Sequence, residues 1–185
     1  MGNFIELLIS GVLLGSVYAL AASGLSLNFG IMGIVNLAHG ELIMLGAYAT
    51  YWIWFLFKIN PFLAILGAII ILFIFSVFVY KTAIKRIIGE EQLVSLIITY
   101  GISIVLWNFA QLGFTSSFKS VEYSLGSVSF RESFFSLNQV SGLIAVVIIM
   151  VGFHQYLTYS KTGKSIRAVA QNANVASLSG INVNR

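Results

Sequence analysis

Long apolar runs recur along this chain, and short segments that hold most of its charged residues separate them. Read with a window of about 19 residues, the pattern predicts helices long enough to cross a bilayer. These runs lie near 7–29, 31–57, 62–80, 92–117 and 138–159. The predicted fold is all-α: a polytopic membrane helix bundle of about five spans. Asn60 and Pro61 supply an N-cap and a first-turn proline to the third span.

Composition agrees with a bilayer as the solvent. Hydrophobic types make up 58% of the 185 residues and charged types only 9%, whereas a soluble domain has about 25% charged residues. The chain contains no cysteine, which excludes disulfides and cysteine metal sites. Its net charge of +4 comes from cations between the apolar runs rather than from a basic stripe. We therefore expect membrane lipid as a partner, no nucleic acid and no metal.

Lysine and arginine gather in two of the connecting segments, which two spans separate. Three cations lie in the loop 81–91 and four in the tail from residue 160: Lys81, Lys85, Arg86, Lys161, Lys164, Arg167 and Arg185. By the positive-inside rule these segments are cytoplasmic. The chain is then a multi-pass protein with its N-terminus and the loop 119–136 outside.

The second run is unusual because Asn36, His39 and Glu41 interrupt its apolar pattern. A carboxylate at the bilayer centre costs several kcal/mol, so it should face a bundle interior or a watery cavity. On a regular helix His39 and Glu41 would point about 200° apart. One continuous helix therefore cannot direct both side chains into one cavity.

Glycines in the same stretch predict a discontinuous or re-entrant element over residues 28–46. They are Gly30, Gly33 and Gly40. In one interpretation Asn36, His39 and Glu41 line a permeation path. In the other, Asn36 and His39 cap the freed backbone groups, and Glu41 is neutral or paired. We expect no catalytic residue here, since no serine or aspartate nucleophile motif accompanies His39 and Glu41.

Two helical faces carry residues of one kind at every fourth position. The first run has a ridge of small residues: Gly11, Gly15, Ala19 and Ser23. Such a ridge allows another helix to approach closely, either within one bundle, which we favour, or at a seam between subunits. The fourth run has a polar stripe: Ser95, Thr99 and Ser103. Its hydroxyls could wet a cavity, but hydrogen bonds between helices are the favoured interpretation.

The basic tail contains Gly163, Lys164 and Ser165, which resemble the end of a phosphate-binding loop. That motif fails, because Thr158 stands where its first glycine belongs and no strand precedes it. The alanine-rich residues 166–178 instead predict one short helix that Gly180 ends. A cytoplasmic helix of this kind can contact a soluble partner; the alternative is an ordinary connecting loop.

Four segments of the chain carry a resemblance to a known family. Residues 11–20 (GVLLGSVYAL), 28–48 (NFGIMGIVNLAHGELIMLGAY), 99–108 (TYGISIVLWN) and 163–182 resemble the permease subunits of branched-chain amino-acid ABC importers. The resemblance implies a non-enzymatic subunit in a bacterial-type plasma (inner) membrane. It would pair with a second permease subunit, two cytoplasmic ATPase subunits and an extracytoplasmic substrate-binding protein. No cofactor is expected in this chain, because the partner subunits bind the ATP.

The same resemblance implies roles for two segments. Asn36, His39, Gly40 and Glu41 would lie at the broken helix near the translocation path, and residues 166–181 would couple to the ATPase. The expected coupling residues are Gly163, Arg167, Ala168, Asn172, Ala176, Gly180 and Ile181. We expect residues 1–185 to form one transmembrane domain, the N-terminal part of a longer permease, with 160–185 as its cytoplasmic coupling segment. Urea or other small polar solutes as cargo, or a truncated non-transporting scaffold, stay as alternatives.

Overall fold

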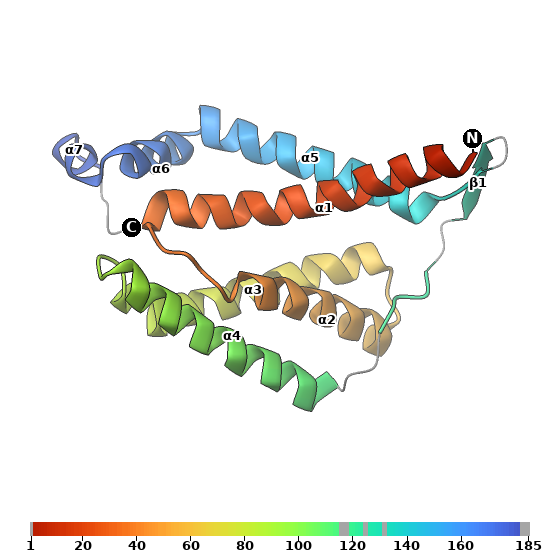
Figure 1. Ribbon diagram of the computed structural model, residues 1–185, viewed down its shortest axis with the longest axis horizontal. Helices are drawn as coiled ribbons and strands as arrows, with labels where there is room; N and C mark the ends of the chain where they lie inside the picture. Colours follow the sequence, from red (N-terminus) through yellow and green to blue (C-terminus); the bar gives the residue numbers. More distant parts are fainter. Residues whose placement is uncertain (1, 115–118, 124–125, 131–132, 182–185) are drawn as a thin grey trace. The chain divides into compact units, whose positions relative to one another are not determined.

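The computed structural model describes residues 2–114, 119–123, 126–130 and 133–181. The chain divides into two compact units (Figure 1). Unit 1 comprises Met1–Met32 and Ser124–Arg185, and unit 2 comprises Gly33–Tyr123. The expectation of a single transmembrane domain stays a prediction.

Unit 1 consists of two long helices, two short helices and a hairpin. Its elements are α1 (Gly2–Met32), β1 (Ser127–Phe130), β2 (Ser133–Ser136), α5 (Leu137–Tyr159), α6 (Lys161–Gln171) and α7 (Ala173–Leu178). Helix α1 packs along α5, and α6 contacts both of them (Figure 1). The strands pair antiparallel, with Ser127 opposite Ser136. This hairpin lies in the connection for which the sequence analysis expects only a loop.

Unit 2 is built around α2. Its elements are α2 (His39–Phe57), α3 (Pro61–Thr82), the 3-10 turn η1 (Ile84–Arg86) and α4 (Gln92–Phe114). Helix α2 packs against both α3 and α4. Helix α3 begins as the sequence predicts: Pro61 is its first residue, and the Asn60 side chain accepts the Phe62 N–H at 3.0 Å.

Small residues bring α2 and α3 close together. A Cβ at Gly46 would lie 2.8 Å from Leu72 Cδ1, and a Cβ at Gly67 would lie 3.1 Å from Ile53 Cδ1. Ala64, one turn before Gly67 on α3, is fully buried. Because helices in lipid associate through close packing rather than through exclusion of water, these small side chains fix the helix pair. The sequence analysis did not identify this contact.

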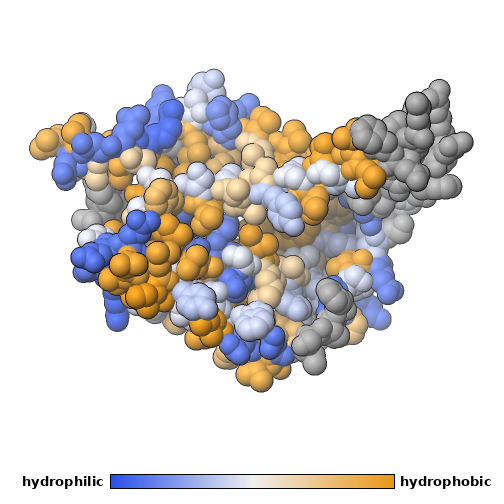
Figure 2. Space-filling model, viewed as in Figure 1, coloured by the Kyte–Doolittle hydropathy of each residue, from blue (hydrophilic) through white to orange (hydrophobic). Residues whose placement is uncertain are grey.

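Within the residues that the structure describes, five helices are long and apolar enough to cross a membrane: Ser10–Met32, His39–Phe57, Pro61–Arg86, Gln92–Phe114 and Val140–Tyr159. The predicted all-α class with five spans is therefore confirmed, and the short hairpin is an addition to it. Large apolar side chains such as Ile70, Phe73 and Ile148 are exposed along these helices. The face of the molecule in Figure 2 carries many hydrophobic residues, drawn in orange. Apolar exposure on this scale is typical of a surface that contacts lipid.

Candidate functional site

The second apolar run is broken, as the sequence predicts. Helix α1 ends at Met32 and α2 begins at His39, so residues 33–38 form a non-helical segment, here called the helix break. Gly33 has a φ of +65°, a left-handed conformation that glycine adopts without a steric cost. Gly30 lies within α1 and Gly40 within α2. Gly33 is therefore the glycine on which the break depends.

The Thr99 side chain of α4 binds the backbone of the helix break. Its hydroxyl accepts the Leu37 N–H at 3.3 Å and lies 3.2 Å from the Val35 carbonyl oxygen. The same hydroxyl lies 2.8 Å from the Ser95 carbonyl oxygen of its own helix. A hydroxyl has one proton, so it donates to one of these carbonyls at a time. The hydroxyl oxygen can accept the Leu37 N–H whichever carbonyl oxygen receives the hydroxyl proton.

The polar stripe on α4 faces protein. Ser95 is 1% exposed, Thr99 0% and Ser103 8%. Thr99 forms hydrogen bonds beyond its own helix, but the partner is the non-helical backbone of the helix break and not the other helix that the sequence analysis predicts. Such a partner matters at membrane depth, where free N–H and C=O groups have no water to bind.

Asn36 closes the turn that leads into α2. Its side-chain oxygen accepts the Ala38 N–H at 3.1 Å, and its carbonyl oxygen accepts the His39 N–H at 3.2 Å. The Ala38 carbonyl oxygen then accepts the Leu42 N–H at 3.1 Å, which is the first hydrogen bond of the helix. Asparagine forms side-chain turns of this kind readily. These contacts support the capping interpretation of Asn36; its place on a translocation path stays a prediction.

His39, Gly40 and Glu41 occupy the first turn of α2, on the C-terminal side of the break. His39 and Glu41 therefore keep the spacing of a regular helix, about 200° apart. The break does not bring the two side chains together, which argues against joint chemistry at this site. The Glu41 carboxylate in the first turn interacts favourably with the positive end of the helix dipole. The role of these residues in transport stays a prediction.

The turn from α5 into α6 requires a glycine at position 163. A Cβ there would lie 2.5 Å from the Tyr156 carbonyl oxygen and 2.6 Å from Leu157 Cα. The Ser160 hydroxyl accepts the Gly163 N–H at 2.8 Å and so caps α6. The Arg167 guanidinium donates to the Thr158 carbonyl oxygen at 3.1 Å. Gly163 and Arg167, both from the expected coupling residues, thus hold α6 against the end of α5.

The prediction of one helix over residues 166–178 is wrong, because the tail forms two helices that Asn172 separates. Asn172 has an extended backbone, with a φ of −160° and a ψ of 105°, and its side chain accepts the N–H groups of Asn174 and Val175 at 3.0 and 3.1 Å. Asparagine is among the preferred N-cap residues. The same residue therefore ends α6 and begins α7.

Helix α7 ends at Gly180, as the sequence predicts. Gly180 has a φ of +79°. Its N–H donates to the Ser177 carbonyl oxygen at 3.0 Å, and the Ile181 N–H donates to the Ala176 carbonyl oxygen at 3.1 Å. This pair of bonds is a Schellman motif. Of the remaining expected coupling residues, Ala176 is buried and Ala168 of α6 is half-buried. Contact of any of these residues with an ATPase stays a prediction.

Comparison with known proteins identifies the family. The model of the family described as "Branched-chain amino acid transport system / permease component" matches residues 7–185. The chain belongs to this family. The predicted family resemblance is thus confirmed, and with five candidate spans the chain is a multi-pass membrane protein.

Curated relatives of this permease-family chain carry branched-chain amino acid transport in their names. The high-affinity branched-chain amino acid transport system permease proteins LivH of Salmonella typhimurium and LivH of Escherichia coli K12 are both 30% identical to it. The high-affinity permease protein BraD of Pseudomonas aeruginosa is also 30% identical. Each alignment covers 98% of this chain and 64% of the relative. The chain thus spans less than two thirds of their length. No solved structure matches it.

The small-residue ridge of α1 has no close neighbour at its first two positions. Gly11, Gly15 and Ala19 are exposed, and a Cβ at Gly11 or Gly15 would meet no atom within 4 Å. Ser23 is half-buried, and its hydroxyl donates to the Leu20 carbonyl oxygen of the same helix. The packing role of the ridge in this permease-family chain stays a prediction.

Proposed function

We propose that this chain is a membrane-spanning permease subunit of an ATP-driven, binding-protein-dependent importer of branched-chain amino acids. The observation that carries the proposal is the family match across residues 7–185. The names of the relatives supply the cargo class. The proposed partners are a second permease subunit, two cytoplasmic ATPase subunits and an extracytoplasmic substrate-binding protein. ATP hydrolysis belongs to the ATPase subunits.

The construction of the tail supports a coupling role for α6 and α7. Gly163 and Arg167 tie α6 to the end of α5, so a force on the tail reaches a membrane-spanning helix without passing through a loose linker. Helix α7 presents apolar side chains to solvent: Leu178 is 88% exposed and Val175 57%. An exposed apolar face on a short helix is the feature that a groove on a soluble partner recognises. We therefore assign the ATPase contact to α7.

The helix break is our candidate for the segment beside the translocation path. Non-helical backbone at membrane depth is tolerated where it is buried in protein or lines a cavity. Asn36 and Thr99 satisfy backbone groups of the break, and Glu41 follows in the first turn of α2. Discontinuous helices with unwound backbone form the substrate and ion sites of other transporters.

Uptake measurements test the part of the proposal that concerns Glu41. We expect Glu41→Gln to reduce uptake of labelled leucine by vesicles that carry the complete importer, because the substitution removes the charge and keeps the shape. Glu122→Gln serves as the matched control, because it makes the same substitution at an exposed position outside the candidate membrane spans. Full uptake with Glu41→Gln would leave Glu41 with a structural role only.

Co-purification with the ATPase subunits tests the coupling role. We expect Leu178→Ser to weaken co-purification when the ATPases are expressed together with the full chain. Because Leu178 is exposed, its replacement should leave membrane insertion and thermal stability unchanged. Ile88→Ser is the matched control, since Ile88 is an exposed apolar residue in the other basic connection. Unchanged co-purification with Leu178→Ser would refute the assignment of α7.

A second pair of variants tests the Schellman motif. Gly180 and Gly89 both have a positive φ, +79° and +92°, so alanine costs about 1–2 kcal/mol of local strain at either position. Only Gly180→Ala should weaken ATPase co-purification, because only Gly180 ends α7. If neither wild type nor variants co-purify with an ATPase or transport leucine, the chain is a non-transporting scaffold.

Orientation is a separate part of the proposal. The positive-inside rule places the connection 81–91 and the tail from residue 160 in the cytoplasm and the N-terminus outside. Because the chain has no cysteine, single engineered cysteines report accessibility without background. A cysteine at Lys164 should react with an impermeant maleimide only in inside-out vesicles, and one at Lys119 only in right-side-out vesicles. The reverse pattern would overturn the orientation.

A further inference from the structure

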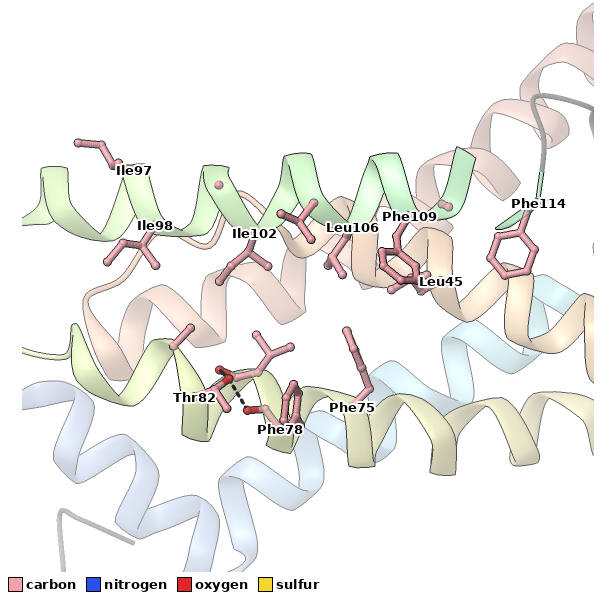
Figure 3. Close-up of a pocket in the computed structure, with 15 residues that line it drawn as sticks. Leu45, Phe75, Phe78, Thr82, Ile97, Ile98, Ile102, Leu106, Phe109 and Phe114 are labelled. Carbon is pink, nitrogen blue, oxygen red and sulfur yellow. Dashed lines mark hydrogen bonds between the residues drawn. The ribbon is translucent and has the colours of Figure 1, made fainter. Parts of the chain in front are cut away.

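An apolar groove runs between α3 and α4 of unit 2, and Leu45 of α2 also lines it (Figure 3). Its volume is about 890 Å³. Phe75 and Phe78 of α3 lie across from Ile102 and Phe109 of α4. The polar side chain in the lining is Thr82, whose hydroxyl already donates to the Phe78 carbonyl oxygen at 2.8 Å. The groove therefore suits an apolar occupant.

One wall of the groove is shorter and the other is longer than the hydrocarbon of one bilayer leaflet. At 1.5 Å per residue, its wall on α3 from Phe75 to Thr82 is about 10 Å long, and its wall on α4 from Ile97 to Phe114 is about 25 Å long. Half of the hydrocarbon core measures about 15 Å. Ile97 and Phe109, which line the groove on α4, are exposed, and α3 and α4 are both candidate membrane spans. An acyl chain therefore has the chemistry to enter.

Cations follow directly after the end of the groove. Thr82 and Ala83 are the last lining residues on the α3 side, and the cations of this connection lie within four residues of Thr82: Lys81, Lys85 and Arg86. All three side chains are exposed. Glu90 and Glu91 belong to the same connection, but within the described part of the chain they form no ion pair with these cations. The connection keeps a net charge of +1, from three cations and two acids.

We propose that the α3–α4 groove binds an anionic phospholipid, with its acyl chains between the helices and its phosphate near Lys81, Lys85 and Arg86. Bulk lipid is as apolar as the groove, so contact with hydrocarbon alone gives no preference for this place. The headgroup supplies the preference, since each nearby lysine or arginine strengthens binding of an anionic lipid about fivefold. The phenylalanine side chains in the lining limit the shape of the acyl chains that can enter the groove.

Native mass spectrometry of the full chain tests the headgroup. After delipidation in detergent, the protein is titrated with phosphatidylglycerol or with phosphatidylcholine of the same acyl chains. We expect phosphatidylglycerol to bind at least tenfold more tightly. Replacing Lys81, Lys85 and Arg86 together by glutamine should remove that preference. The matched control replaces Lys58, Lys161 and Lys164 by glutamine, which changes the total charge equally and should leave the preference in place.

A second pair of variants tests the groove itself. Gly101 lines it and Gly113 does not, and a Cβ at either glycine of α4 would meet no atom within 4 Å. Gly101→Phe should therefore fill the groove without strain and reduce binding of both lipids at least tenfold. Gly113→Phe should bind lipid as the wild type does. Equal binding of the two lipids by wild type, or an unaffected Gly101→Phe, would overturn the proposal.

Another protein helix is the competing occupant, and the absence of cysteine allows a direct test. Ile98→Cys places a single thiol in the groove. In vesicles of native lipid composition, an oxidant should yield monomer if a lipid occupies the groove. A disulfide-linked dimer would show that a second copy fills it and would overturn the proposal. None of these readouts measures leucine uptake or ATPase co-purification, so their failure leaves the proposed transport function untouched.

Discussion

Replacement of Thr99 by valine is the most direct perturbation of the helix break. Valine has nearly the shape of threonine, so the substitution leaves no cavity at a fully buried position. It removes only the hydroxyl, and with it the acceptor of the Leu37 N–H. The carbonyls of Val35 and Ser95 lose a shared donor. The variant therefore separates the hydrogen bonding of Thr99 from its packing.

The expected loss of stability is about 1–1.5 kcal/mol. A buried donor left without its partner costs about 1–3 kcal/mol, whereas hydrogen bonds between membrane helices contribute about 0.6 kcal/mol on average. The N···O distance at Leu37 is 3.3 Å, longer than the usual distance of about 2.9–3.0 Å, which favours the lower half of the range. The predicted loss corresponds to roughly a tenfold increase in opening of the break.

Hydrogen exchange and thermal unfolding in one detergent measure the effect. We expect the peptide that covers residues 33–38 to exchange about tenfold faster in Thr99→Val, and Thr99→Ser to restore most of the protection. Thr50→Val is the matched control, because the Thr50 hydroxyl donates to the Gly46 carbonyl within α2 and not to the helix break. The reasoning is wrong if Thr99→Val and Thr50→Val behave alike in both measurements.

Three further substitutions test packing and capping through thermal unfolding or hydrogen exchange. Gly163→Ala should cost about 1–3 kcal/mol, because its Cβ meets backbone atoms of α5; Gly152→Ala, where a Cβ meets nothing within 4 Å, should cost nothing measurable. Asn172→Ala should destabilise α7 by about 1 kcal/mol and quicken its exchange; slower exchange would indicate a continuous helix and contradict the capping role. Gly67→Leu should lower the unfolding temperature through overpacking against α2, whereas Gly113→Leu should not.

The spans could be predicted because their signal is local. An apolar run of about 20 residues has few alternatives to a membrane helix, and the start of α3 is specified by Asn60 and Pro61 side by side. The same holds for Gly180, where a glycine after the last alanine-rich turn predicts the left-handed residue that the structure contains. Each of these features depends on residues that are close together in the sequence.

Asn172 shows where helix propensity alone fails. Alanine-rich sequence on both sides favours one continuous helix, and the weak helix propensity of one asparagine is not enough to decide against it. The decisive factor is that its side chain accepts two N–H groups that a continuous helix would have bonded internally. The preference of asparagine for the N-cap position was the signal that could have predicted a second helix here, since Asn172 precedes a second short alanine-containing turn.

To predict the helix break, one needs both the local sequence pattern and a contact between residues far apart in the chain. Glycines and polar residues in an apolar run predict a break somewhere between residues 28 and 46, but three glycines compete for its position. The structure places it before His39, and the reason lies 62 residues away, where Thr99 accepts the Leu37 N–H. The pattern of the second run does not identify Thr99 as a partner. The sequence alone therefore left open whether His39 and Glu41 lie on one face of a helix. The break precedes both residues, so their helical spacing keeps them apart, and Glu41 must act alone if it acts in transport.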